Sequence, residues 1–391
     1  MFSLLLALIY VCFISLGLPD SLLGSAWPVI YQEIYVPVSF AGIISMIISI
    51  GTVISSSISG WLLRKLGTGK MTAISIAMTA VALFGFSVSN RFWMLIVWAI
   101  PYGLGAGGVD SVLNNYVALH CKSQHMSWLH CMWGVGASAS PYIMSFSLIK
   151  LENWRSGYLI VAVIQIILAF FIFLSLPLWK KTTAPTESNE STSENKLKLK
   201  EILTLPGIIP CFLTFFCYCA LEMTTSLWAS SYLVQNRGIS PEIASGFASL
   251  FYIGITIGRA INGFLSMKFK DRVLIRLGLG LIGGGILFVF LPFHPTFALI
   301  GFVIIGLGCA PVYPCIIHMT PELFGREKSQ AIMGIQIACA YLGFCLMPPL
   351  FGVLANRIDI ALLPIYLSIL LVIMASMHEI VVVKTKKSAT A

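Results

Sequence analysis

Four charged residues lie inside long apolar stretches of this sequence, and their side chains are the ones most able to do chemistry: Asp20, Asp110, Glu222 and Arg259. A carboxylate in the core of a bilayer costs roughly 2.5–3.5 kcal/mol on insertion scales, so it is expected to face a protein interior or a watery cavity and to mark an ion or substrate path. Loss of solvation also favours the neutral carboxyl group, which suits a proton carrier. We therefore expect Asp20, Asp110 and Glu222 to bind a coupling cation or exchange a proton. A structural hydrogen bond between helices is the alternative for Asp20 and Asp110, and binding of a substrate hydroxyl is the alternative for Glu222.

Asp110 follows a glycine run inside an apolar stretch that extends from about residue 92 to residue 119. Glycines remove side chains from a membrane helix and let neighbouring backbones approach closely. Asn114 comes one helical turn after Asp110, on the same face. The run is not a nucleotide-binding loop, since no strand precedes it and no Lys-Ser/Thr pair follows. These residues predict a membrane helix that carries a polar site.

Composition assigns the chain to the integral membrane proteins. Of its 391 residues 58% are hydrophobic and 10% are charged, whereas about a quarter of the residues in a soluble domain are charged. We expect twelve spans, at about residues 3–32, 38–63, 71–89, 92–119, 126–149, 154–179, 204–235, 241–265, 273–291, 296–318, 327–354 and 361–383.

The basic residues predict the orientation of these spans in the cell membrane. With the N-terminus in the cytoplasm, the outside segments hold five basic residues: Arg91, Lys150, Arg155, Arg237 and Arg357. With Arg259 inside a span, 18 of the 24 Lys and Arg residues are then cytoplasmic. This asymmetry predicts that both termini lie in the cytoplasm.

Two features predict how the spans are organised. Pro19 and Pro28 flank Asp20 in the first span, and broken helices with an acid near mid-depth are typical of transporter sites. A polar stretch rich in Lys, Thr, Ser, Glu and Asn predicts a flexible cytoplasmic linker at 181–203. The linker would separate an N-terminal six-helix bundle, 1–180, from a C-terminal bundle with a short cytoplasmic tail, 204–391.

The second half of the chain repeats the first at an offset near 203 residues. Turns, glycines and mid-helix acids correspond: Gly60 with Gly263, Gly103 with Gly306, Gly105 with Gly308, Asp110 with Tyr313, and Asp20 with Met223, next to Glu222. Parallel repeats with a site between them describe the major facilitator architecture. The predicted fold is therefore an all-α membrane protein with twelve transmembrane helices in two pseudo-symmetric six-helix bundles.

Specific motifs make the whole chain resemble the major facilitator superfamily. Gly60 to Lys70 is similar to the superfamily's loop between spans two and three, although Arg64 stands where that motif usually has an acid. Further segments resemble the fucose:proton symporter family, including its sodium-dependent glucose transporter branch: Gly103 to Asn115, Leu129-His130, Trp133-Gly134-x-Gly136-Ala137, Leu221-Glu222 with Trp228, Gly258-Arg259, and Ala310 to Pro314. The resemblance matches Asp110 and Asn114 with the family's span-four acid and asparagine. For Asp20 the match is displaced, because fucose permeases carry their first-span acid about one turn later, where this chain has Gly24.

Polar and aromatic residues in the cavity-lining spans are candidates for binding substrate, because a sugar needs hydrogen-bond groups and an aromatic face. They are Asn114, Asn115, His130, Trp133, Trp228, Tyr313, Gln336 and Trp27. A satisfied core residue is the alternative for His130 and Gln336, and a lipid anchor is the alternative for the tryptophans. Arg259 and Arg64 are candidates for gating; for Arg259 a gate or an inter-helix ion pair is favoured, and contact with substrate is the alternative. His130 has no second histidine at metal-binding spacing, and the ten cysteines form no disulfide or metal framework.

The sequence thus predicts cation-coupled uptake of a sugar or similar polyhydroxylated solute by alternating access, with H⁺ or Na⁺ as the coupling ion. The expected partners are this small solute, the ion and the lipid bilayer; no enzymatic activity, cofactor, metal, nucleic acid or obligate protein partner is expected. The main rival is a drug:proton antiporter working in efflux. Gly134, Gly136 and Ser140-Pro141 partly match the fifth-span motif of such antiporters, but Tyr-Ile-Met-Ser follows where they have glycines. A non-transporting receptor or scaffold is a third, weaker interpretation.

Overall fold

The protein is described here by a computed structural model covering residues 2–121, 123–180 and 199–389, and these residues form helices without a β-strand. The first half contains α1 (Phe2–Asp20), α2 (Leu22–Glu33), α3 (Phe40–Leu66), α4 (Thr68–Ser87), α5 (Phe92–His120), α6 (Ser123–Lys150), α7 (Trp154–Leu174) and α8 (Leu176–Lys180). The second half contains α9 (Leu199–Leu203), α10 (Ile208–Arg237), α11 (Pro241–Leu265), α12 (Asp271–Phe290), α13 (Pro295–Phe324), α14 (Arg326–Arg357), η1 (Ile360–Leu362) and α15 (Leu363–Ala389).

The first membrane span is broken at the acid, as the sequence indicated. An apolar stretch of 30 residues, Leu4–Glu33, is long enough to cross a bilayer. It is divided into α1 and α2, with Ser21 between them and Pro19 in the last turn of α1. Asp20 therefore ends a helix in the interior of the protein.

Eleven helical stretches in the described part of the chain are long and apolar enough to span a membrane, compared with twelve predicted spans. The remaining predicted span, 126–149, lies in α6, a helix of 28 residues rich in serine and glycine. Because α6 packs against α1, α7 and α11, much of its surface meets protein and does not need the apolar side chains that lipid demands. The all-α fold with two six-helix bundles is confirmed.

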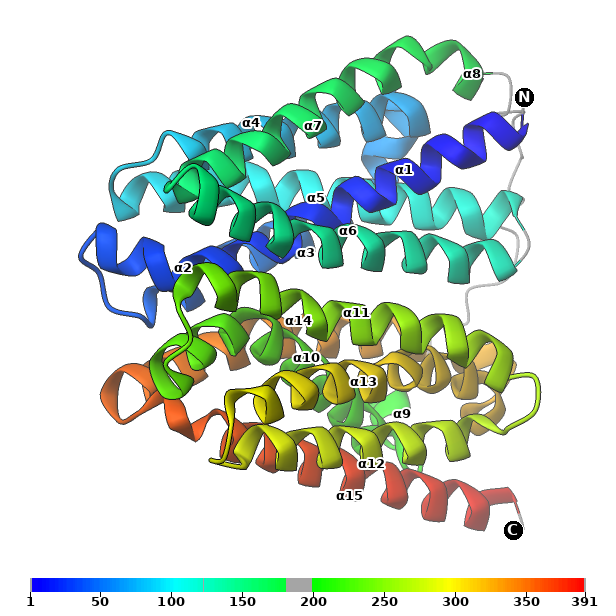
Figure 1. Cartoon of the computed structure of the whole chain (residues 1–391). Helices are drawn as coiled ribbons and strands as arrows, with labels where there is room; N and C mark the ends of the chain where they lie inside the picture. The colour runs from blue at the N-terminus through cyan, green and yellow to red at the C-terminus, as the bar shows by residue number, and fades with distance from the viewer. Residues whose placement is uncertain (1, 122, 181–198, 390–391) are drawn as a thin grey trace.

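The helices form two groups that lie side by side (Figure 1). In one, α4 packs on α5 and α7, and α1 packs on α6; in the other, α13 packs on α11 and α12, and α10 packs on α14 and α15. The groups meet where α6 packs on α11, α3 on α14 and α2 on α10. Residues 181–198 of the predicted linker fall outside the described residues, so the proposed boundaries at 181–203 remain a prediction.

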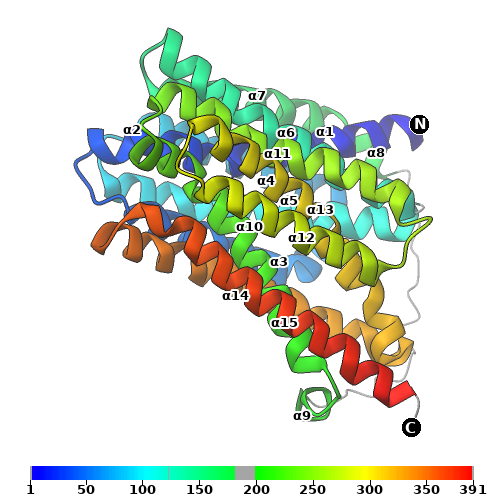
Figure 2. The same ribbon diagram turned by 60° about the horizontal axis from the view of Figure 1, so that its bottom comes forward.

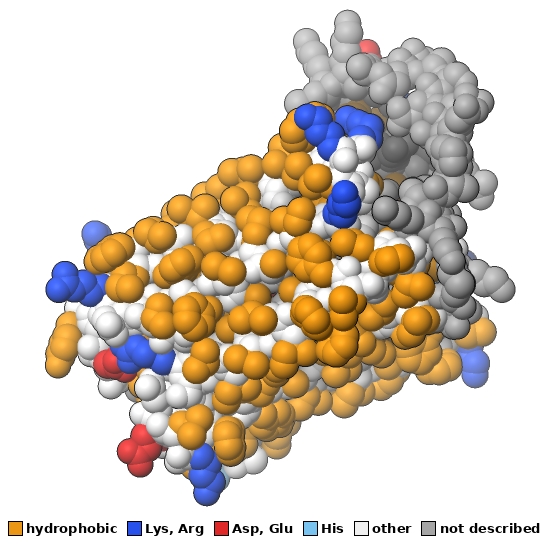
Figure 3. Space-filling view, turned by 90° about the horizontal axis from the view of Figure 1, so that it is seen from above, with side chains coloured by type: hydrophobic (Ala, Val, Ile, Leu, Met, Phe, Trp, Pro, Cys, Tyr) orange, Lys and Arg blue, Asp and Glu red, His pale blue; other side chains and the backbone are white. Residues whose placement is uncertain are grey.

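The groups are joined mainly at the end of the molecule opposite the termini. Figure 2 shows the helices spreading apart toward the end where the N- and C-termini lie. At the other end the Ser145 hydroxyl of α6 donates a hydrogen bond to the Glu242 carbonyl of α11 at 2.7 Å, and Gly42 of α3 lies against Pro349 of α14. Apolar side chains cover the face in Figure 3, while Lys, Arg, Asp and Glu gather toward its two ends. This distribution fits a molecule surrounded by lipid around its middle.

Glycine contacts show that the 203-residue repeat extends to individual packing positions. In the first half, Gly103 lies against Ile48 and Gly105 against Ser75; in the second half, Gly306 lies against Phe251 and Gly308 against Gly278. A methyl group added at Gly103, Gly105, Gly306 or Gly308 would collide with backbone atoms of the neighbouring helix. Both residues of each second-half contact lie 203 positions after their counterparts in the first half. The two halves thus use equivalent backbone approaches to hold their fourth span.

We expect Gly103→Ala to destabilise the protein, because its Cβ would strike the Ile48 carbonyl of α3. Overpacking of this kind costs about 1–3 kcal/mol, and thermal unfolding of the purified protein should show a lower midpoint. Gly280→Ala is the matched control, since nothing lies within 4 Å of that position, and its better helix propensity should leave the midpoint unchanged or higher. Equal midpoints for both variants would contradict the proposed packing role.

Candidate functional site

Asp20 lies at the break between α1 and α2 and is held by two aromatic donors. The Tyr102 hydroxyl of α5 donates to one carboxylate oxygen at 3.0 Å, and the Trp133 indole N–H of α6 donates to the other at 2.7 Å. Gly17 and Gly136 bring the α1 and α6 backbones into direct contact beside Trp133. The break between α1 and α2 places the Asp20 carboxylate, and close packing of α1 on α6 brings the Trp133 donor to it.

Arg259 of α11 lies between an acid of its own bundle and an aromatic ring of the other. One guanidinium nitrogen is 3.7 Å from a Glu222 carboxylate oxygen of α10, and both side chains are largely buried, at 17% and 13% exposure. The guanidinium carbon lies 5.1 Å from the centre of the Trp133 ring, within the range of a cation–π contact. The inter-helix ion pair is thus present, and a gating role for Arg259 remains a prediction.

Tyr252 of α11 was not among the predicted site residues. Its hydroxyl hydrogen-bonds the Ser226 hydroxyl, and its ring meets Trp133 edge-on with centroids 6.2 Å apart. It lies close enough to both Asp20 and Glu222 for electrostatic interaction. Its spacing was a usable signal, because residues seven apart, such as Tyr252 and Arg259, share a helix face. Tyr102 was also missed, although it directly precedes the glycine run.

Asp110 of α5 lacks a basic partner in the described part of the chain. The Asn114 amide donates to its carboxylate at 2.9 Å, and Asp20 is near enough for the two charges to interact. Asn115, the next residue along, points elsewhere and is exposed. The Asp110–Asn114 pair therefore lies with Asp20 in a region where no described basic side chain is within ion-pair distance of either acid.

His130 and Tyr313 flank this region from α6 and α13. His130 is partly buried, meets Phe13 edge-on at 5.9 Å, and lies within electrostatic range of Arg259. Tyr313 packs on Phe215 at 4.9 Å and is also partly buried. The predicted residues that the structure brings to this part of the interface are Asp20, Asp110, Asn114, His130, Trp133, Glu222, Arg259 and Tyr313.

Three predicted substrate residues lie in the core instead. Trp27 and Trp228 are both 0% exposed; their indole N–H groups donate to the Val38 carbonyl at 2.7 Å and the Pro348 carbonyl at 3.0 Å. Gln336 is likewise 0% exposed. Its amide accepts a hydrogen bond from Thr320 and donates to Cys211. In this conformation these side chains stabilise packing and offer no surface to a solute.

Arg64, the other predicted gating residue, lies near the surface in the last turn of α3. This turn lies far along α3 from Gly42 and the contact with α14. The structure does not bring Arg64 into the charged region, and its gating role remains a prediction.

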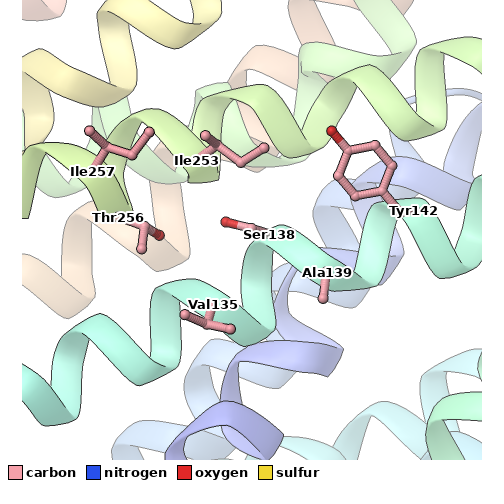
Figure 4. Close-up of a pocket in the computed structure, with 7 residues that line it drawn as sticks. All are labelled: Val135, Ser138, Ala139, Tyr142, Ile253, Thr256 and Ile257. Carbon is pink, nitrogen blue, oxygen red and sulfur yellow. The ribbon is translucent and has the colours of Figure 1, made fainter.

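A pocket of about 290 Å³ lies in the contact region between α6 and α11. In Figure 4 Ser138 of α6 and Thr256 of α11 point into the space between the helices, next to Val135, Ile253 and Ile257. Both hydroxyls already donate to carbonyls of their own helices. Few polar groups are left to recognise a solute, so this pocket is not a good candidate for the substrate site.

Two six-helix bundles with charged residues between them are the architecture of a membrane transporter. The model of the Major Facilitator Superfamily matches residues 9–248 and 211–390, and the chain belongs to that superfamily. The predicted superfamily is confirmed, and membership makes the chain a transporter and not an enzyme.

The similarity of the chain to known proteins covers nearly its whole length. Bypass of stop codon protein 6 from Saccharomyces cerevisiae is 24% identical over 91% of this chain and 78% of its own. Glucose/mannose transporter GlcP from Bacillus subtilis is 22% identical over 90% of this chain and 88% of its own. The crystal structure of a mutant of the nucleoside transporter NupG superimposes with a TM-score of 0.79 at 15% identity, covering 95% of this chain and 98% of that one; at this identity the likeness concerns the fold alone.

We expect Trp228→Ala to reduce stability without raising the KM of the folded transporter. The indole is fully buried against Gly352 and Phe351, and removing a large core aromatic costs about 3–5 kcal/mol. Thermal unfolding and transport per folded molecule, measured on the same preparation, separate these effects. Trp93→Ala provides the control, since Trp93 is 58% exposed. A raised KM at unchanged stability would instead favour the stacking role that the sequence suggested.

Proposed function

We propose that this transporter couples the uptake of a sugar or similar polyhydroxylated solute to the movement of H⁺ or Na⁺. The observation that carries the proposal is an imbalance of charge. Among the described residues, Glu222 is paired with Arg259, whereas Asp20 and Asp110 are not within ion-pair distance of a basic side chain. Two interacting carboxylates without a counter-ion favour uptake of a cation.

Cation uptake would make the conformational change possible. A bundle that closes around two negative charges must desolvate them, at a cost of several kcal/mol per ion. Binding a cation or proton removes part of that charge before closure. On this model Asp110 binds or exchanges the coupling ion, and Asp20 and Glu222 adjust to its presence. The two bundles then rock around the site.

Polar side chains in this part of the interface support a hydroxylated solute. Asn114, His130 and Tyr313 are partly exposed and provide donors and acceptors of hydrogen bonds. An apolar and adaptable surface would suit a lipophilic drug better. Similarity to a protein named as a glucose/mannose transporter agrees with this choice. The imported solute is therefore proposed to be a neutral sugar bound between α5, α6 and α13.

Uptake of radiolabelled hexoses into proteoliposomes, with pH and sodium gradients imposed separately, tests this proposal. We expect saturable accumulation under one of the two gradients, and its collapse when an ionophore dissipates that gradient. Absence of sugar uptake, together with improved tolerance of lipophilic cations in cells expressing the protein, would favour efflux instead.

Asp110→Asn should abolish gradient-driven accumulation while preserving exchange of solute between equal pools. The amide keeps the shape of the side chain and can still contact Asn114, but it can no longer gain or lose a charge. Accumulation and counterflow are measured in the same vesicles. Glu152→Gln, the same change at an exposed loop residue, should affect neither. Normal accumulation by Asp110→Asn would show that Asp110 is structural.

Asn114→Ala should raise the KM for the sugar at least tenfold. One lost buried hydrogen bond accounts for this, because tenfold corresponds to about 1.4 kcal/mol. Asn115→Ala is the neighbouring control, since Asn115 is exposed. Equal KM values for both variants would remove Asn114 from the proposed site.

A further inference from the structure

Of the ion pairs and cation–π contacts between described residues, one crosses between the bundles, and it joins Arg259 to the ring of Trp133. The ion pairs between described side chains all stay within α1–α8 or within α10–α15. Elsewhere α6 and α11 bring small and hydroxylated residues together, with Gly134 against Thr256 and Gly246 against Ser145, and apolar residues such as Val135 and Ile253 line the pocket between the two helices. We call this region of packing between α6 and α11 the α6–α11 seam.

Both the indole N–H and the ring face of Trp133 make contacts at the α6–α11 seam. Its N–H donates to Asp20 at 2.7 Å, and its ring lies 5.1 Å from the Arg259 guanidinium carbon. Accepting this hydrogen bond, an ionised carboxylate polarises the indole and increases the negative charge on the ring face that attracts the cation. This effect weakens when Asp20 becomes neutral.

We propose that Trp133 is a positioning residue that transmits the charge state of Asp20 to Arg259. While Asp20 is negative, Trp133 and Arg259 hold the α6–α11 seam in the conformation described above; when a cation or proton neutralises Asp20, the seam is released. The identity of the neutralising ion rests on the proposed cation coupling, whereas the dependence of the seam on the charge of Asp20 is independent of that proposal.

Other titratable groups face both ends of this link. Tyr102 of α5 donates a hydrogen bond to Asp20, and Asp110 of α5 and Tyr252 of α11 lie within electrostatic range of it. The titratable groups within electrostatic range of Arg259 are Glu222 and Tyr218 of α10, Cys309 and Tyr313 of α13, and His130 and Cys131 of α6. The Glu222–Arg259 separation of 3.7 Å exceeds the roughly 2.7–2.9 Å of a strong charge-assisted hydrogen bond. Arg259 is thus shared between Glu222 and Trp133, and Glu222 can hold it when Trp133 releases it.

A second tryptophan of the chain also donates to a carboxylate and lies against a guanidinium group, but this group of residues lies within the first bundle. The Trp154 indole donates to Glu33 at 2.6 Å, and the Arg155 guanidinium carbon lies 4.4 Å from the Trp154 ring. All three residues belong to α2 and α7. Trp154→Phe therefore removes a tryptophan–carboxylate hydrogen bond without touching the α6–α11 seam, and it serves as the matched control.

A double-mutant cycle on the full-length protein in lipid nanodiscs tests the proposal. Spin-labelled non-natural residues replace Trp128 of α6 and Phe264 of α11, which are 56% and 75% exposed. Distance distributions then report the populations of the seam conformations. We expect Asp20→Asn, which mimics the neutral acid, to change the ratio of these populations at least fivefold. Trp133→Phe, which keeps an aromatic face but loses the N–H, should produce a similar change.

Non-additivity is the decisive result, because residues acting through one another do not give additive effects. In the Trp133→Phe background, Asp20→Asn should shift the populations by less than twofold, whereas in the Trp154→Phe background it should keep its full effect. An equal effect of Asp20→Asn in the Trp133→Phe and wild-type backgrounds would overturn the proposal, as would no effect in either. A purely structural role of Trp133 gives the first of these outcomes.

A second variant tests the other end of the link without altering Trp133. Combining Arg259→Gln with Glu222→Gln removes the cation and its paired acid together, so that neither member of this pair is left buried without its partner. Asp20→Asn should then no longer shift the populations, and a persisting shift would contradict the proposal. The measurements need no solute, so failure of sugar uptake and failure of this coupling are distinguishable outcomes.

Discussion

Charge inside a low-dielectric protein interior is the constraint on which this structure depends. An isolated ion there costs several kcal/mol, and the cost is avoided by pairing, by hydrogen bonding or by neutralisation. The three acids differ in compensation: Glu222 is paired with Arg259, Asp20 accepts two aromatic donors, and Asp110 has only the Asn114 amide as a hydrogen-bond partner among the described residues. The acid with the least compensation is the one whose charge is easiest to change.

Backbone contact through glycine allows the charged residues to be held at defined positions. Gly17 and Gly136 bring α1 against α6, so that Trp133 reaches Asp20 across one helix contact. Glycines of the fourth span of each half fix the helices that carry Asp110 and Tyr313. Because lipid is as apolar as leucine, such contacts rely on close packing and not on hydrophobic burial. The repeated glycines therefore hold the helices that carry Asp110 and Tyr313 at close, defined separations from their neighbours.

Sequence reasoning worked best where the physics is local or where burial of charge admits few solutions. Most spans, the break at Asp20 and the repeat at 203 residues follow from apolar length, proline and glycine positions. The positions of Trp27, Trp228 and Gln336 could not be predicted in this way: the sequence suggested that they bind substrate, but all three are fully buried. In a membrane protein both the lipid face and the core are apolar, so an aromatic residue gives no periodic signal of the face it occupies. The carbonyls that satisfy Trp27 and Trp228 belong to residues 11 and 120 positions away, and such partners appear only once the helices are packed.

The composition of α6 has a physical meaning in this setting. Its serines and glycines lower its hydropathy, yet they let it pack directly on α1 and α11. The α6–α11 seam thus combines close contacts at small residues with the larger side chains of Trp133 and Tyr252, and the bundles also meet where α3 packs on α14 and α2 on α10. Moving a two-state equilibrium from 1:99 to 99:1 takes about 5.5 kcal/mol of differential binding. On the proposed mechanism, a cation bound beside two carboxylates would supply part of that free energy, because desolvating a carboxylate that stays charged costs several kcal/mol.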